Sequence, residues 1–170
     1  MTRQERALTV AEIRELVAAV PDPEMPMVTL EDLGILRDVR RGATGAVVVT
    51  ITPTYSGCPA LDAIGDDIRA RLAACDETAV EVRTALSPPW STDWISAEGR
   101  RKLAAHGIAP PPERAPGPGA GGGTFVPLSV RCPNCGSVET RELSRFGATA
   151  CRAIHVCAAC GEPFDRVKPL

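Results

Sequence analysis

The stretch VVVTITPTYSGCPALDAIGDDI, residues 47–68, decides the fold of the first part of the chain. It opens with β-branched residues, which favour a strand. It closes with Leu61, Ile64 and Ile68 at helical spacing, the pattern of a buried helix face. Between the two, Cys58 directly precedes Pro59, a residue suited to the first turn of a helix because its missing N–H costs nothing there. The stretch therefore predicts a strand, a turn that carries a thiol, and a helix.

The flanking segments complete a small sandwich. Upstream, Thr9 and Glu12 match a capping box that starts a helix ending before Pro21. Strands are predicted at 35–41 and 46–52 around the turn GATG, and AVEVRTAL at 79–86 alternates like a half-solvated strand. A strand–helix–strand unit favours a parallel third strand. The predicted fold class is α+β, an α-β-β-α-β sandwich with a mixed sheet, and a further short helix is expected at 96–106.

The segment APPPERAPGPGAGGG, residues 109–123, predicts a linker, because ten of its 15 residues are proline or glycine. The expected domains are therefore an α/β domain at 1–108, the linker at 109–123 and a small module at 124–170.

Two C-x-x-C-G knuckles, separated by 21 residues, mark that second module. Two such turns bring four thiolates together as zinc prefers, and each glycine permits the tight turn that follows. We expect a β zinc ribbon with strands at 125–132, 137–143 and 149–157. Free or disulfide-bonded cysteines and an iron or Fe–S centre are the alternatives, while Cys151 and His155 are expected to be packing or surface residues. The predicted ligands of structural Zn²⁺ are Cys132, Cys135, Cys157 and Cys160.

Composition argues against several classes of function. The net charge is −2, and residues 1–115 carry 13 basic and 17 acidic side chains, so no nucleic-acid partner is expected. The N-terminus has no apolar signal region and no stretch is long enough to span a bilayer, so the protein is expected to be cytoplasmic with no membrane partner. Seven cysteines in that compartment favour metal ligation or thiol chemistry over disulfides.

Cys58 has two interpretations. A thiol at the start of a helix is stabilised as thiolate by the macrodipole and free N–H groups, so Cys58 could act as a nucleophile or a metal ligand. It could equally be a small hydrophobic residue of the core. The proline-rich segment VPDPEMP, residues 20–26, projects Asp22 and Glu24 from a short loop, either as functional carboxylates or as a polar end to the first helix.

Several short segments of residues 8–105 together resemble a known protein family. DPEMP at 22–26, DLGIL, VVTITPTYSGCP and PPW at 88–90 resemble the iron–sulfur-assembly (DUF59, metal–sulfur cluster biosynthesis) family over residues 8–105. The resemblance implies a site for transient iron or a cluster at Asp22, Glu24, Thr54 and Cys58. With the linker and the ending FGATACRAIHVCAACGEPFDRVK at 146–168, the whole chain resembles the PaaD (PaaJ) family of phenylacetate degradation.

The resemblance implies an accessory or maturation subunit of the phenylacetyl-CoA epoxidase, a multicomponent di-iron oxygenase, with its oxygenase or reductase subunits as partners. The sequence contains no E-x-x-H pair, and no G-x-G-x-x-G between a predicted strand and a predicted helix that could bind a nicotinamide or a flavin, so the chain itself is not expected to catalyse the oxygenation. Two other classes remain open: a nucleic-acid-binding ribbon protein and a thiol enzyme using Cys58. The sequence leaves the oligomeric state open, including a homo-oligomer.

Overall fold

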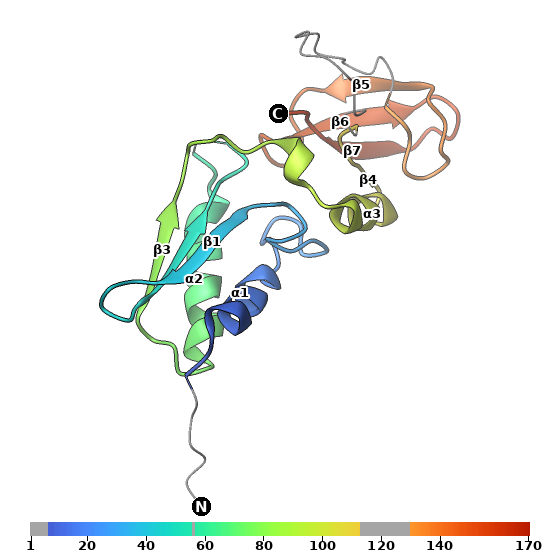
Figure 1. Cartoon of the computed structure of the whole chain (residues 1–170). Helices are drawn as coiled ribbons and strands as arrows, with labels where there is room; N and C mark the ends of the chain where they lie inside the picture. Colours follow the sequence, from blue (N-terminus) through green and yellow to red (C-terminus); the bar gives the residue numbers. More distant parts are fainter. Residues whose placement is uncertain (1–6, 56, 113–129) are drawn as a thin grey trace, which may run out of the picture. The chain divides into compact units, whose positions relative to one another are not determined.

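The computed structural model describes residues 7–55, 57–112 and 130–170, and the chain divides into two compact units, Met1–Trp90 and Ser91–Leu170 (Figure 1). The fold class is α+β, as predicted. None of the helices in these ranges has the length and apolar character needed to cross a bilayer.

The first unit is a three-stranded mixed sheet with two helices. The strand order is β1-β2-β3, with β1 antiparallel and β3 parallel to β2, so the predicted parallel third strand is confirmed. Figure 1 shows α2 lying behind the sheet. The elements are α1 (Val10–Ala18), β1 (Leu36–Arg41), β2 (Val47–Ile51), α2 (Ala60–Ala73) and β3 (Val80–Thr84).

The core of this unit follows the sequence pattern. Val47, Val49 and Ile51 of β2 are buried on the helix side of the sheet, where Ile64, Ile68 and Leu72 of α2 are also buried. Pro59 is the N-cap of α2, one position before the helix begins, and Leu61 is only half-buried. Trp90 closes the unit, because its indole N–H donates a 2.8 Å hydrogen bond to the carbonyl of Leu33.

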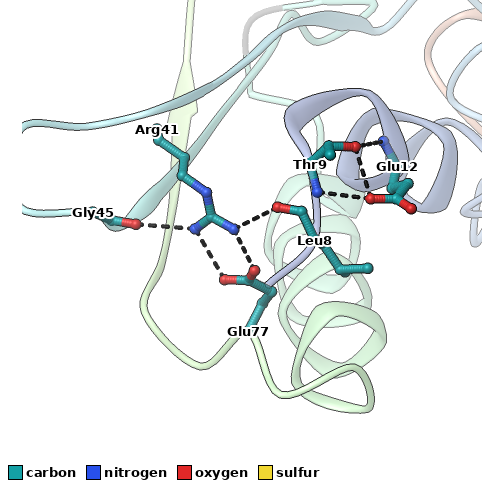
Figure 2. Close-up of polar contacts among 6 residues, drawn as sticks. All are labelled: Leu8, Thr9, Glu12, Arg41, Gly45 and Glu77. Atoms are coloured by element: carbon teal, nitrogen blue, oxygen red, sulfur yellow. Dashed lines mark hydrogen bonds and ion pairs between the residues drawn. The ribbon is translucent and has the colours of Figure 1, made fainter. Parts of the chain in front are cut away.

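An ion pair joins three segments of this unit (Figure 2). The Arg41 guanidinium, at the end of β1, donates to both carboxylate oxygens of Glu77, which follows α2. The same guanidinium donates to the carbonyls of Gly45 in the hairpin turn (3.1 Å) and of Leu8 before α1 (2.9 Å). Beside it, the predicted capping box of Thr9 and Glu12 is present at the start of α1.

The second unit is a four-stranded sheet with one α-helix. The strand order is β4-β7-β6-β5, in which β6 pairs antiparallel with both β5 and β7, and β4 runs parallel to β7. Strand β7 follows the second knuckle and was not predicted from the sequence. The elements are a 3-10 turn η1 (Thr92–Trp94), α3 (Ala97–Ala105), β4 (Ile108–Ala109), β5 (Thr140–Ser144), β6 (Arg152–Cys157) and β7 (Pro163–Val167).

The division between the units differs from the expected boundary at residue 108. Ile108 pairs with Asp165 and Ala109 with Arg166, so α3 and β4 belong with the ribbon strands and not with the first sheet. Ala109, the first residue of the expected linker, is 1% exposed. The rest of that linker from residue 113 onward, and most of the strand expected at 125–132, lie outside the described residues.

Candidate metal centres

Two matching turns present the four ribbon cysteines. In the first turn Gly136 N–H donates to the Cys132 carbonyl (2.9 Å), and in the second Gly161 N–H donates to the Cys157 carbonyl (3.0 Å). Both glycines have positive φ, 76° and 77°, a conformation that disfavours a side chain. The turns therefore need the glycine of each C-x-x-C-G motif, as the sequence predicted.

The four sulfur atoms converge as a metal would require. All four Sγ atoms lie within 4.8 Å of one another. The Cys132–Cys160 Sγ distance is 3.8 Å and the Cys135–Cys157 distance is 3.5 Å. A tetrahedral Zn²⁺ with Zn–S bonds of ~2.3 Å places its sulfur ligands ~3.8 Å apart. The four residues fit a metal ion without any backbone movement.

The electrostatics of the cluster also favour a cation. The backbone N–H of Cys160, with that of Ala159, stabilises the Cys157 thiolate and lowers the pKa of Cys157 to about 7. At Cys135 the Ser137 N–H also favours the thiolate, but hydrogen bonding to Cys157 and burial raise the pKa of Cys135 to about 12. Cys157 therefore ionises readily, whereas its neighbour Cys135 does not. A bound dication would offset the repulsion between neighbouring thiolates and allow all four cysteines to be deprotonated.

Cys151 and His155 do not join this cluster in the part of the chain that the structure describes. Cys151 is buried, with its Sγ 3.0 Å from Thr149 Oγ1. The His155 ring is 5% exposed and stacks on Phe164 with 5.8 Å between ring centroids. Burial, with the nearby Arg166 charge, lowers the pKa of His155 below its ordinary value. His155 is therefore a buried packing residue of the ribbon.

Cys58 lies in the turn between β2 and α2, as predicted. Its N–H donates to the Tyr55 carbonyl (3.3 Å) and its carbonyl accepts from Leu61 N–H (3.3 Å), so the turn leads directly into the helix. The thiol is half-buried, as is Thr54. This exposure makes Cys58 more accessible than a core residue and less accessible than Cys75, which is exposed at the other end of α2.

The Asp22–Glu24 loop is built on the Asp22 carboxylate. Asp22 is 6% exposed, and its Oδ1 accepts hydrogen bonds from the N–H groups of Glu24 (2.9 Å) and Met25 (2.8 Å). This geometry tightens the loop, a role the sequence did not indicate. Glu24 remains half-buried at the surface of the loop.

Both segments leave the same end of the first sheet. Leu36, which begins β1, pairs with Ile51, which ends β2, and Thr52 N–H donates to the Ile35 carbonyl (2.9 Å). The loop preceding β1 and the turn following β2 therefore start as neighbours. Across the described ranges, however, the ribbon cysteines are the one group of three or more ligands whose donor atoms gather closely. The side chains of Asp22, Glu24 and Cys58 form no such group.

The comparisons with known proteins match both units. Residues 10–83 match the family of iron–sulfur cluster assembly proteins, and residues 120–168 match the PaaD zinc beta ribbon domain. A solved DUF59 domain from Bacillus anthracis is similar at 29% identity and a TM-score of 0.50, over 55% of this chain and 90% of that one. The resemblances stated from the sequence are thereby confirmed.

Two curated relatives extend the match. An Fe-S protein maturation auxiliary factor of Porphyromonas gingivalis is 35% identical over 96 residues, 56% of this chain and 90% of that protein. A protein of Escherichia coli K12, named as a putative component of 1,2-phenylacetyl-CoA epoxidase, is 42% identical over 159 residues, 94% of this chain and 92% of that protein. The chain belongs to the PaaD family, which it shares with that epoxidase component.

Proposed function

We propose that the chain is a maturation subunit of the phenylacetyl-CoA epoxidase system, and that it delivers iron or a cluster to an oxygenase or reductase partner in the cytoplasm. The observation that carries the proposal is the contrast between its two thiol sites. Four cysteines converge in the ribbon, whereas Cys58 is a single half-buried thiol at the end of the first sheet that also bears the Asp22–Glu24 loop.

A bound metal would stay at the two sites for different times. A Cys₄ site has no open position and retains Zn²⁺, which stabilises a small module. Cys132, Cys135, Cys157 and Cys160 would hold that zinc as a structural ion. One thiolate with a carboxylate would bind iron more weakly and release it to a better ligand set, as delivery requires.

Each residue at the first site has a proposed part. Cys58 supplies the thiolate, and Glu24 supplies a carboxylate oxygen from the adjoining loop. Asp22 positions Glu24, because its Oδ1 accepts the Glu24 and Met25 N–H groups. The Thr54 hydroxyl, four residues before Cys58, would donate to the thiolate. The iron or cluster is cargo, and the chain performs no oxygenation.

A pair of cysteine variants tests the proposal. Cys58→Ala and Cys75→Ala each remove one thiol outside the ribbon, and both should leave the zinc content unchanged. In a strain growing on phenylacetate, we expect Cys58→Ala alone to lower growth and to lower the iron or acid-labile sulfide of the purified epoxidase and reductase subunits. A fully loaded, active partner in the Cys58→Ala strain would refute delivery by this site.

A further inference from the structure

Strand β3 forms an edge of the first sheet. β2 pairs with it on one side, and within the described residues no strand pairs with it on the other (Figure 1). An edge of this kind presents a row of N–H and C=O groups to which another strand can bind.

The hydrogen bonds to β2 show which groups face outward. Val47 N–H donates to the Ala79 carbonyl and Ala85 N–H donates to the Ile51 carbonyl, both at 2.8 Å. In a parallel pair every second residue bonds to the same neighbour, so the odd-numbered residues of this segment face β2. The backbone groups of Val80, Val82 and Thr84 therefore point to the open edge.

The two faces of β3 differ in chemistry. On the face away from the helices, Glu81 and Arg83 form an ion pair of 2.7 Å, and each side chain is about half exposed at 52% and 51%. On the helix side, Val82 and Thr84 line a hollow of about 350 Å³ with residues of α2. Ile51 and Leu61 also line this hollow, together with the charged side chains of Asp62, Asp66 and Arg69.

We propose that the occupant of this edge is β3 of a second copy of the chain, paired antiparallel about a two-fold axis at Val82. In this register Val82 faces its own symmetry mate and Val80 faces Thr84, which are the residues with outward backbone groups. Glu81 then lies opposite Arg83 of the second copy, twice, as a non-hydrogen-bonded pair whose side chains approach closely. The two sheets would form one six-stranded sheet.

The charges select this register over its neighbours. The outward backbone groups of β3 recur at every second residue. The nearest alternative two-fold axes that still pair these groups therefore pass through Glu81 or Arg83. An axis at Glu81 places two glutamates opposite each other, and an axis at Arg83 places two arginines opposite each other, both unfavourable. The segment VEVRT is therefore self-complementary in one antiparallel register, a property that a foreign partner strand would not require.

Charge reversal tests the pairing in the full-length, zinc-loaded chain under reducing conditions. Sedimentation equilibrium over a concentration series should show a monomer–dimer equilibrium for the natural sequence. Glu81→Arg and Arg83→Glu should each raise the dissociation constant at least about tenfold, because each places like charges opposite each other twice. Mixing the two variants restores both opposite-charge pairs and should restore dimers, as should the double variant Glu81→Arg/Arg83→Glu.

Two results would overturn the proposal. One is a natural chain that stays monomeric up to its solubility limit. The other is a dimer whose dissociation constant is unaffected by either single variant, or whose loss is not reversed by mixing them. Circular dichroism of each variant checks that the fold is unchanged, and the mixture serves as an internal control because both variants must be folded to pair.

Discussion

Cys135 and Cys157 belong to different knuckles of the ribbon, yet their Sγ atoms lie 3.5 Å apart. We therefore expect one zinc per chain, and expect Cys157→Ser to lose it. A structural zinc site contributes roughly 10 kcal/mol or more of apparent binding energy, so the second unit should unfold at ordinary temperatures without the ion. Elemental analysis and circular dichroism would measure both effects. Cys75→Ser, which removes an exposed thiol of the first unit, should keep the zinc; equal zinc in both variants would contradict the assignment.

Two variants of Asp22 can distinguish a role in positioning the loop from a role as a metal ligand. Asp22→Ala removes the acceptor of two backbone N–H groups and should destabilise the first unit by about 1–3 kcal/mol. Asp22→Asn retains an acceptor oxygen there, so it should keep the fold and support growth on phenylacetate. If folded Asp22→Asn is as defective as Cys58→Ala, the negative charge itself is needed and Asp22 is a ligand.

The Arg41–Glu77 pair predicts a pH dependence of the stability of the first unit. The Arg41 hydrogen bond holds the pKa of Glu77 below its ordinary value of 4.5 in the folded state. The Arg41–Glu77 ion pair therefore contributes its full stabilisation to the folded first unit above pH 4.5. This contribution is lost as the pH falls through the lower pKa that Glu77 has in the folded state. Glu77→Gln should cost about 1–2 kcal/mol at pH 7, and the difference from the natural chain should shrink in acid.

Urea denaturation followed by the amide signals of β2 would measure this difference at both pH values. Asp66→Asn is the matched control, because Asp66 pairs with Arg69 while 80% of its side chain is exposed. Exposed pairs contribute little, so this control should change stability little at either pH. A Glu77→Gln cost that does not change with pH would show that the ion pair is not its source.

The pairing of β4 with β7 predicts where the second unit can be cut. A fragment of residues 124–170 retains all four cysteines but lacks α3 and β4. Because Ile108 and Ala109 are buried, we expect it to be less stable than the fragment 91–170 by about 2 kcal/mol. Thermal melting of both zinc-loaded fragments would compare them. Equal melting temperatures would mean that β4 adds nothing to the ribbon.

Local patterns predicted much of the first unit. The capping box at Thr9, the hairpin, the helix after Cys58 and the parallel strand at Val80 each leave a signature within a few neighbouring residues. The grouping of the four ribbon cysteines was predictable for the same reason, because each knuckle is a local turn with its own glycine.

The features that were missed depend on distant partners. β4 has two residues, too few for any periodic pattern. Ala109 is buried in a cluster with Cys132, Cys157 and Phe164, which lie far along the chain and which the β4–β7 pairing brings close. The proline content that follows Ala109 favoured a linker. Asp22 was predicted as part of the site with Cys58. Its Oδ1 also accepts backbone N–H groups of its own loop, a contact that residue type alone does not reveal.

The hydrogen bond from Trp90 to Leu33 gives the protein a built-in spectroscopic probe. The chain has two tryptophans, and each compact unit contains one: Trp90 closes the first and Trp94 lies in η1 of the second. The Trp90 indole is 6% exposed and hydrogen-bonded, so its fluorescence should shift to longer wavelength when the first unit opens. The fluorescence of a Trp94→Phe chain would report on the first unit alone, and that of a Trp90→Phe chain on the second unit alone. Removal of the zinc should therefore change the emission of the Trp90→Phe chain and leave that of the Trp94→Phe chain unchanged.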